Sequence, residues 1–110
     1  SLIRQDVRLT AENGIIKRYF GAIKTIYKQQ TVNFSNLDEI KTFTFDMGEQ
    51  LKVEDLVTAE AVGDTTHILN CYYDGTTNTV KVIAQNTYNG PTAPVIRVKV
   101  LRHTNISYFG

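Results

Sequence analysis

Two side chains that could act as a general base or hold a metal ion, His67 and Cys71, lie four residues apart in this chain of 110 residues. On a helix this spacing would bring both side chains onto one face. On a strand they would point the same way but lie roughly 13 Å apart, beyond joint ligation of one ion. The surrounding residues favour a strand, so we expect a strand-edge histidine and a small buried thiol.

The carboxylates cluster at positions 38–39, 54–55 and 60–64, but none of these clusters has the spacing of a known acid/base pair or calcium loop. Residues 74–78 resemble a calcium loop superficially, yet they lack its repeated acidic positions and terminal glutamate, so a hairpin explains them better. No G-x-S-x-G motif or phosphate-binding glycine pattern is present. We therefore expect no catalytic residue, no metal and no cofactor, and hence no enzyme.

A basic stretch at residues 17–28 is interleaved with Tyr19, Phe20 and Tyr27, an arrangement that could stack on nucleic-acid bases. The formal net charge is only +1, from 12 basic and 11 acidic side chains, so no overall field attracts nucleic acid or an anionic membrane. We expect neither partner. The single cysteine and the lack of an apolar span or leader in this sequence favour assembly in a reducing cytoplasm.

Pairs of turn-forming residues recur along the chain, and from residue 47 onward they are 11 to 16 positions apart, a spacing typical of a β-meander or sandwich. They are Asn13-Gly14, Met47-Gly48, Gly63-Asp64, Asp74-Gly75 and Asn89-Gly90. No repeat or linker divides the sequence. We expect residues 1–110 to form a single domain, with residues 1–10 as an extended N-terminal arm.

Between the turns, apolar and polar residues alternate with the period of a half-buried strand. The segments 42–47, 67–73, 80–84 and 96–102 follow this pattern, and the segment 56–62 favours a fifth strand. In the 96–102 segment, Ile96, Val98 and Val100 would face the core, with Arg97, Lys99 and Arg102 on the wet side. The sequence predicts a mainly β fold: an antiparallel β-sandwich or jelly-roll-like barrel of about seven or eight strands.

Residues 15–27 fit two structures. Their isoleucines and aromatics fall on one face of a helix, which would give a short N-terminal helix at 15–27. Against a helix stand the central Gly21, the β-favouring composition, and Asn13-Gly14, which would close a hairpin with residues 7–9. Strands are the favoured interpretation.

The segment 43–103 carries a phenylalanine-rich strand, a Gly63-Asp64 turn, and a strand that ends at Tyr73. A Thr-Val-Lys-Val strand at 79–82, Asn86, Gly90 and a closing basic strand then follow. This layout resembles the small β-sandwich structural domains of tailed-phage virion proteins, of the capsid decoration, head-fibre or tail accessory type. Residues 1–34 have no counterpart in the resemblance.

The resemblance implies a virion structural protein, most concretely a capsid decoration or head/tail accessory protein. Such a protein would assemble in the host cytoplasm and stabilise the virion through protein–protein contacts, as a homo-oligomer with a trimer favoured and without a cofactor. The alternative is a receptor- or carbohydrate-binding module of a tail fibre. Such a module would bind its ligand on exposed aromatic rings, such as those of Tyr72, Tyr73, Tyr88 or Tyr108.

The partner interface is expected to use two groups of residues. The arm could add a strand to a neighbour, and its apolar residues are Leu2, Ile3, Val7 and Leu9. The second group is Tyr88, Arg97 and Lys99, from the last turn and the last strand.

Overall fold

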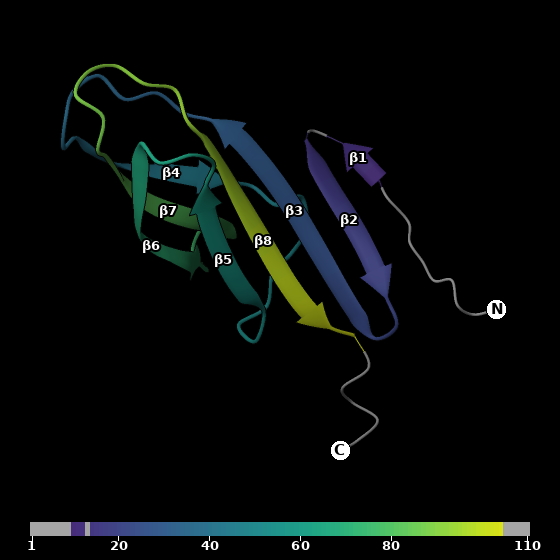
Figure 1. The fold of residues 1–110 in the computed structure, drawn as a ribbon. Helices are drawn as coiled ribbons and strands as arrows, with labels where there is room; N and C mark the ends of the chain where they lie inside the picture. Colours follow the sequence, from purple (N-terminus) through teal and green to yellow (C-terminus); the bar gives the residue numbers. More distant parts are fainter. Residues whose placement is uncertain (1–9, 13, 105–110) are drawn as a thin grey trace.

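The computed structural model describes residues 10–12 and 14–104, and in this part the chain forms eight strands in two antiparallel sheets (Figure 1). The large sheet has the order β1 (Thr10–Glu12), β2 (Ile15–Phe20), β3 (Ile23–Thr31), β8 (Val95–His103) and β5 (Leu56–Ala61). The small sheet has the order β4 (Ile40–Phe45), β7 (Thr79–Asn86) and β6 (Thr66–Asp74). The predicted antiparallel β-sandwich is confirmed.

The alternative of a short helix at 15–27 is wrong. Phe20 pairs with Ile23, so β2 and β3 are joined by a two-residue turn at Gly21-Ala22. Gly21 takes a φ of 60°, a left-handed conformation that suits glycine and matches the twist of a tight hairpin. The glycine that weakened the helical interpretation is therefore the turn residue itself.

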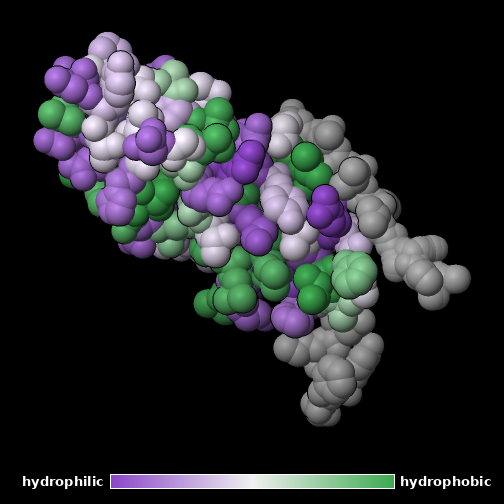
Figure 2. Space-filling model, viewed as in Figure 1, coloured by the Kyte–Doolittle hydropathy of each residue, from purple (hydrophilic) through white to green (hydrophobic). Residues whose placement is uncertain are grey.

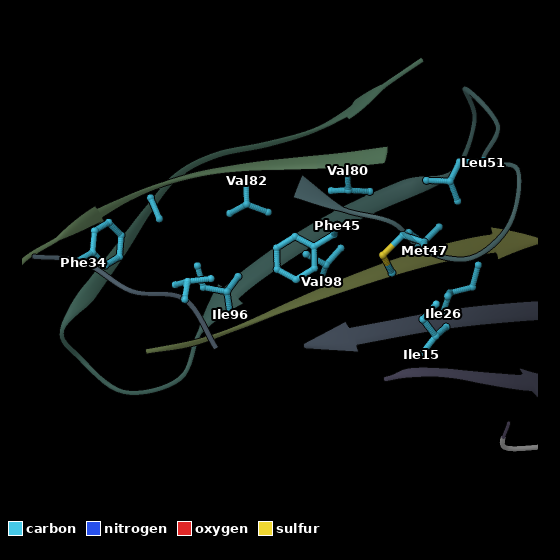
Figure 3. Close-up of a cluster of buried hydrophobic side chains, with 13 residues drawn as sticks. Ile15, Ile26, Phe34, Phe45, Met47, Leu51, Val80, Val82, Ile96 and Val98 are labelled. Carbon is cyan, nitrogen blue, oxygen red and sulfur yellow. The ribbon is translucent and has the colours of Figure 1, made fainter. Parts of the chain in front are cut away.

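The hydrophobic core lies between the two sheets (Figure 3). The central strands β8 and β7 contribute alternate residues to it, as the period of two requires. The segment 46–55, which links β4 to β5, adds Met47 and Leu51. The fully or nearly buried side chains include Ile26, Phe45, Met47, Leu51, Val80, Val82, Ile96, Val98 and Val100.

The expectation that Arg102 lies on the wet face of β8 with Arg97 and Lys99 is wrong. Strand alternation places Arg102 on the same face as Val98 and Val100. Its guanidinium donates to both carboxylate oxygens of Asp55, at 2.9 and 2.7 Å. An inward cation at the end of the core is thus neutralised by the segment 46–55.

A second carboxylate from the same segment, Glu49, joins this ion-pair cluster. It accepts ion pairs from Lys17 at 2.9 Å, Lys24 at 2.7 Å and Arg102 at 3.0 Å. These cations come from β2, β3 and β8. The cluster therefore connects three strands of the large sheet to the segment 46–55, where the apolar core ends.

Candidate interaction surface on the large sheet

The large sheet turns one face away from the small sheet, and we call it the outer face. In the view of Figures 1 and 2 it faces the reader, with the small sheet behind. No described segment crosses it. Strand register assigns to this face Ile16, Arg18, Phe20, Ile23, Thr25, Tyr27, Gln29, Arg97, Lys99, Leu101, Leu56, Thr58 and Glu60.

An apolar rim occupies the end of the outer face where β8 ends and β5 begins. Phe20 is 72% exposed and Leu56 is 63% exposed. The cross-strand partner of Phe20 is Ile23, and that of Leu56 is Leu101. Figure 2 shows hydrophobic side chains gathered at this end of the sheet. A cluster of large exposed apolar side chains marks a candidate protein contact.

The centre of the outer face is hollowed, with a volume of about 870 Å³, and it is lined by both apolar surface and charged side chains. Tyr27 and Lys99 are cross-strand neighbours there, and the Arg18 guanidinium lies 5.7 Å from the centre of the Tyr27 ring. Arg97 is bound by Glu60 at 3.2 Å. Within the described residues, the Lys99 ammonium has no hydrogen-bond acceptor or anion beside it. Among the described side chains, the hollow therefore carries an excess of positive charge.

Only some of the predicted interface residues lie on the outer face. Arg97 and Lys99 both line the hollow, whereas Tyr88 is exposed in the loop between β7 and β8 and does not line it. Leu2, Ile3, Val7 and Leu9 lie outside the described residues. A role for any of them in an interface stays a prediction.

Sequence reasoning missed most of the outer face. Ile16, Arg18 and Tyr27 lie in the stretch that fits both helix and strand, so their common face was not fixed. Once β2 and β3 are accepted as strands, simple alternation places Ile16, Arg18 and Tyr27 together. The exposed Leu56 could have been found by the same rule.

The basic and aromatic residues of 17–28 do not form one nucleic-acid face. Arg18 and Tyr27 lie on the outer face, whereas Lys17 and Lys24 point inward to Glu49. Lys28 also points inward and donates to the Asp46 carbonyl at 3.0 Å. The strand period thus divides a set that looked continuous in the sequence.

His67 and Cys71 are separated more completely than expected. A β-bulge between Ile68 and Asn70 shifts the register, so that His67 pairs with Gln85 whereas Cys71 pairs with Val82. Because Gln85 and Val82 lie on opposite faces of β7, the expectation that His67 and Cys71 point the same way is wrong. Burial raises the pKa of the Cys71 thiol.

The residues 74–78 form the β6–β7 hairpin, as interpreted from the sequence. Asp74 accepts a hydrogen bond from the Thr76 amide at 3.0 Å, and the Asn78 side chain accepts one from the Leu51 amide at 2.9 Å. Their polar atoms are therefore engaged in the fold. Within residues 10–12 and 14–104, no three His, Cys, Asp or Glu side chains are grouped to hold a metal ion.

The described part of the chain contains no helix that is long and apolar enough to cross a membrane.

The fold and surface together define a two-layer antiparallel β domain in which no segment within residues 10–12 and 14–104 covers the outer face. Comparison with family models finds no match, and comparison with curated proteins finds none. Among solved structures, the chain is similar to the R1 pyocin fibre of P. aeruginosa, in a structure of its C-terminal residues 323–701. The two are 18% identical with a TM-score of 0.56 over 88% of this chain. The match spans 28% of the pyocin chain, so it shows a shared fold for one part of that protein.

Proposed function

We propose that this chain is a structural domain of a virion or a related tailed particle, and most concretely a fibre domain that holds its assembly together through protein–protein contacts. The observation that carries the proposal is the outer face, which no described segment crosses, with its exposed Phe20 and Leu56. The fold likeness to part of a pyocin fibre is the reason why a fibre domain is the version that we propose. No catalytic role forms part of the proposal.

The apolar rim would supply the stability of such a contact. Fully burying a side chain of the size of leucine or phenylalanine contributes about 1.5–3 kcal/mol, and Phe20 and Leu56 are both largely exposed in the isolated chain. The positive hollow beside the rim would set the orientation of the partner through charge complementarity. Copies of the same chain, in a trimer, are the partners we favour.

The test compares the double substitution Phe20→Ser and Leu56→Ser with the control Val53→Ser. Val53 is 89% exposed but lies in the segment 46–55 and not on a strand of the outer face. We expect sedimentation velocity to show self-association of the original chain, weakened at least tenfold in the double variant and unchanged in the control. Unchanged association in the double variant would refute the role of the outer face.

A receptor-binding role is the second candidate, because the hollow combines the Tyr27 ring with Arg18 and Lys99. Aromatic rings beside polar groups can hold a sugar. Binding on a glycan array that is lost with Tyr27→Ala, while self-association stays intact, would favour this function. Locating the chain in its native particle by electron cryomicroscopy would separate a fibre from a capsid position.

A further inference from the structure

We propose that the free edge of β5 accepts residues 3–8 of a second copy as an added antiparallel strand. The inference concerns a different surface from the outer face. It rests on the proposed function only in that copies of the chain meet in an assembly.

Three of the four sheet edges in the described part of the chain have features that hinder pairing with another strand. β1 has only three residues, and β6 is interrupted by the bulge between Ile68 and Asn70. At β4, the Thr44 carbonyl accepts a side-chain hydrogen bond from Gln30 at 3.5 Å. Short strands, bulges and covered backbone groups all hinder the pairing of another strand.

The edge of β5 has none of these protections. Its six residues pair with β8 in unbroken register, and they include no proline, glycine or lysine. In an antiparallel ladder, every second residue of an edge strand directs its N–H and C=O groups away from its neighbour. Within the described residues, no side chain or loop bonds to these outward groups of β5. The edge is therefore a template for one more strand.

The two faces of β5 specify what that strand should carry. Its core-facing residues are Val57, Ala59 and Ala61, and the two alanines leave room for larger aliphatic neighbours. On the outer face, the Glu60 side chain is 66% exposed and shares one ion pair, with Arg97. The incoming strand should thus present aliphatic residues to the core and a cation opposite Glu60.

The sequence of residues 3–8 carries this pattern, although these residues lie outside the described part of the structure. An antiparallel register that sets Arg4 opposite Glu60 also sets Ile3 opposite Ala61, Gln5 opposite Ala59 and Val7 opposite Val57. All six residues of β5 are then paired. The charge pair and two of the three core-facing aliphatic positions are met in this one register, and the third core-facing position holds Gln5.

The strand cannot come from the same copy. Residue 10 belongs to β1, which is four strand spacings from β5 in the order of the large sheet, about 19 Å. In the proposed register Arg8 lies opposite Leu56, and the two residues from Arg8 to Thr10 span at most about 7 Å. The donor is therefore a second copy. A head-to-tail exchange of this kind closes into a ring when the rotation between copies allows it.

The test uses the full chain with Cys71→Ala, so that engineered thiols are the only ones present. Asp6→Cys and Thr58→Cys would lie opposite each other in the proposed register. A short bis-maleimide should then link copies of this double variant into covalent oligomers on denaturing gels. The matched control combines Asp6→Cys with Thr42→Cys, an exposed position on β4, and should remain unlinked.

Two further variants check the charge pair and the donor. Glu60→Arg should weaken self-association severalfold, and adding Arg4→Glu should restore it. Linking no stronger than the control would overturn the proposal. So would linking of the single Thr58→Cys variant, because β5 would then pair with β5 of the other copy. Loss of association in the outer-face variants with linking retained would leave β5 exchange standing as a separate contact.

Discussion

Arg102 and Asp55 form a bidentate ion pair, in which the guanidinium donates at 2.9 and 2.7 Å to the two carboxylate oxygens. The Asp55 side chain is only 2% exposed, and it also accepts the Lys52 amide at 2.9 Å. Asp55 lies directly before β5, so the pair fixes the start of an edge strand to β8. This one contact connects the core, the segment 46–55 and the strand edge.

Replacing Asp55 with asparagine should destabilise the protein by about 2 kcal/mol, because it leaves the inward Arg102 cation without its main partner. The control is Glu60→Gln, which breaks the exposed pair with Arg97 and should cost under about 0.5 kcal/mol. Urea unfolding followed by circular dichroism measures both changes. Equal costs for the two variants would contradict the structural role of the buried pair.

Stability should fall at acidic pH because of Glu49 and Asp55. Burial alone would raise the pKa of Glu49, but hydrogen bonds from Lys24 and Lys17 outweigh it and hold the pKa below its ordinary 4.5. For Asp55, the hydrogen bonds from Arg102 and the Lys52 amide likewise outweigh burial and hold the pKa below 3.8. Since both pKa values are lower in the folded state, protons bind the unfolded chain more readily at low pH.

The contribution of these carboxylates is therefore fully present well above pH 4.5 and is lost as the pH falls through the folded pKa values. Urea midpoints measured from pH 7 to pH 2.5 should be level at first and then decline. The double variant Glu49→Gln and Asp55→Asn should show a shallower decline. A decline of the same size in both proteins would locate the acid sensitivity elsewhere.

The strands outside the N-terminal region were predictable because each buries one face, which imposes a period of two on apolar residues. The same rule gives the wrong answer when a residue is assigned to a strand face by its type and not by its position in the alternation. The basic character of Arg102 suggests the wet face with Arg97. Arg102 follows Val100 by two residues, however, so strand alternation places both on the same face. Residue type suggested the wrong face, and the contacts with Asp55 and Glu49 explain an inward arginine.

Two other features had no signal in the sequence. The bulge beside Ile68 adds a residue to β6 without a glycine or proline to mark it, so the relative faces of His67 and Cys71 were misassigned. The ion pairs of Glu49 join positions that are far apart in the chain. Contacts of this kind depend on how the segment 46–55 packs, which local pattern does not determine.

The Cys71 thiol should react slowly in the folded protein. Burial raises its pKa above the ordinary value of 9.0, so little thiolate exists near pH 8. We expect labelling by a disulfide reagent to be slow in buffer and fast in urea, with one thiol reacting per chain. A control variant with an added exposed cysteine, Thr42→Cys, should react rapidly at its new site. Rapid reaction of both thiols in buffer would show that the face of β6 that carries Cys71 is open.

A side chain at position 48 should destabilise the protein, for two separable reasons. It takes a φ of 82°, and a Cβ at this position would lie 2.7 Å from Cδ1 of the buried Ile15. Gly21 also has a positive φ, but a Cβ there would meet nothing within 4 Å. We expect Gly21→Ala to cost about 1 kcal/mol from backbone strain alone, and Gly48→Ala to cost about 1–2 kcal/mol more from the added clash.

A double-mutant cycle distinguishes the two contributions. Ile15→Val removes Cδ1 and should cost about 1 kcal/mol by itself. Because it also removes the atom that a new Cβ would strike, Gly48→Ala should cost less in the Ile15→Val background than in the original chain. Unfolding free energies that simply add would mean that backbone strain alone requires glycine at position 48. A favourable coupling would establish that the segment 46–55 packs directly against β2, which is the contact that brings Glu49 to Lys17 and Lys24.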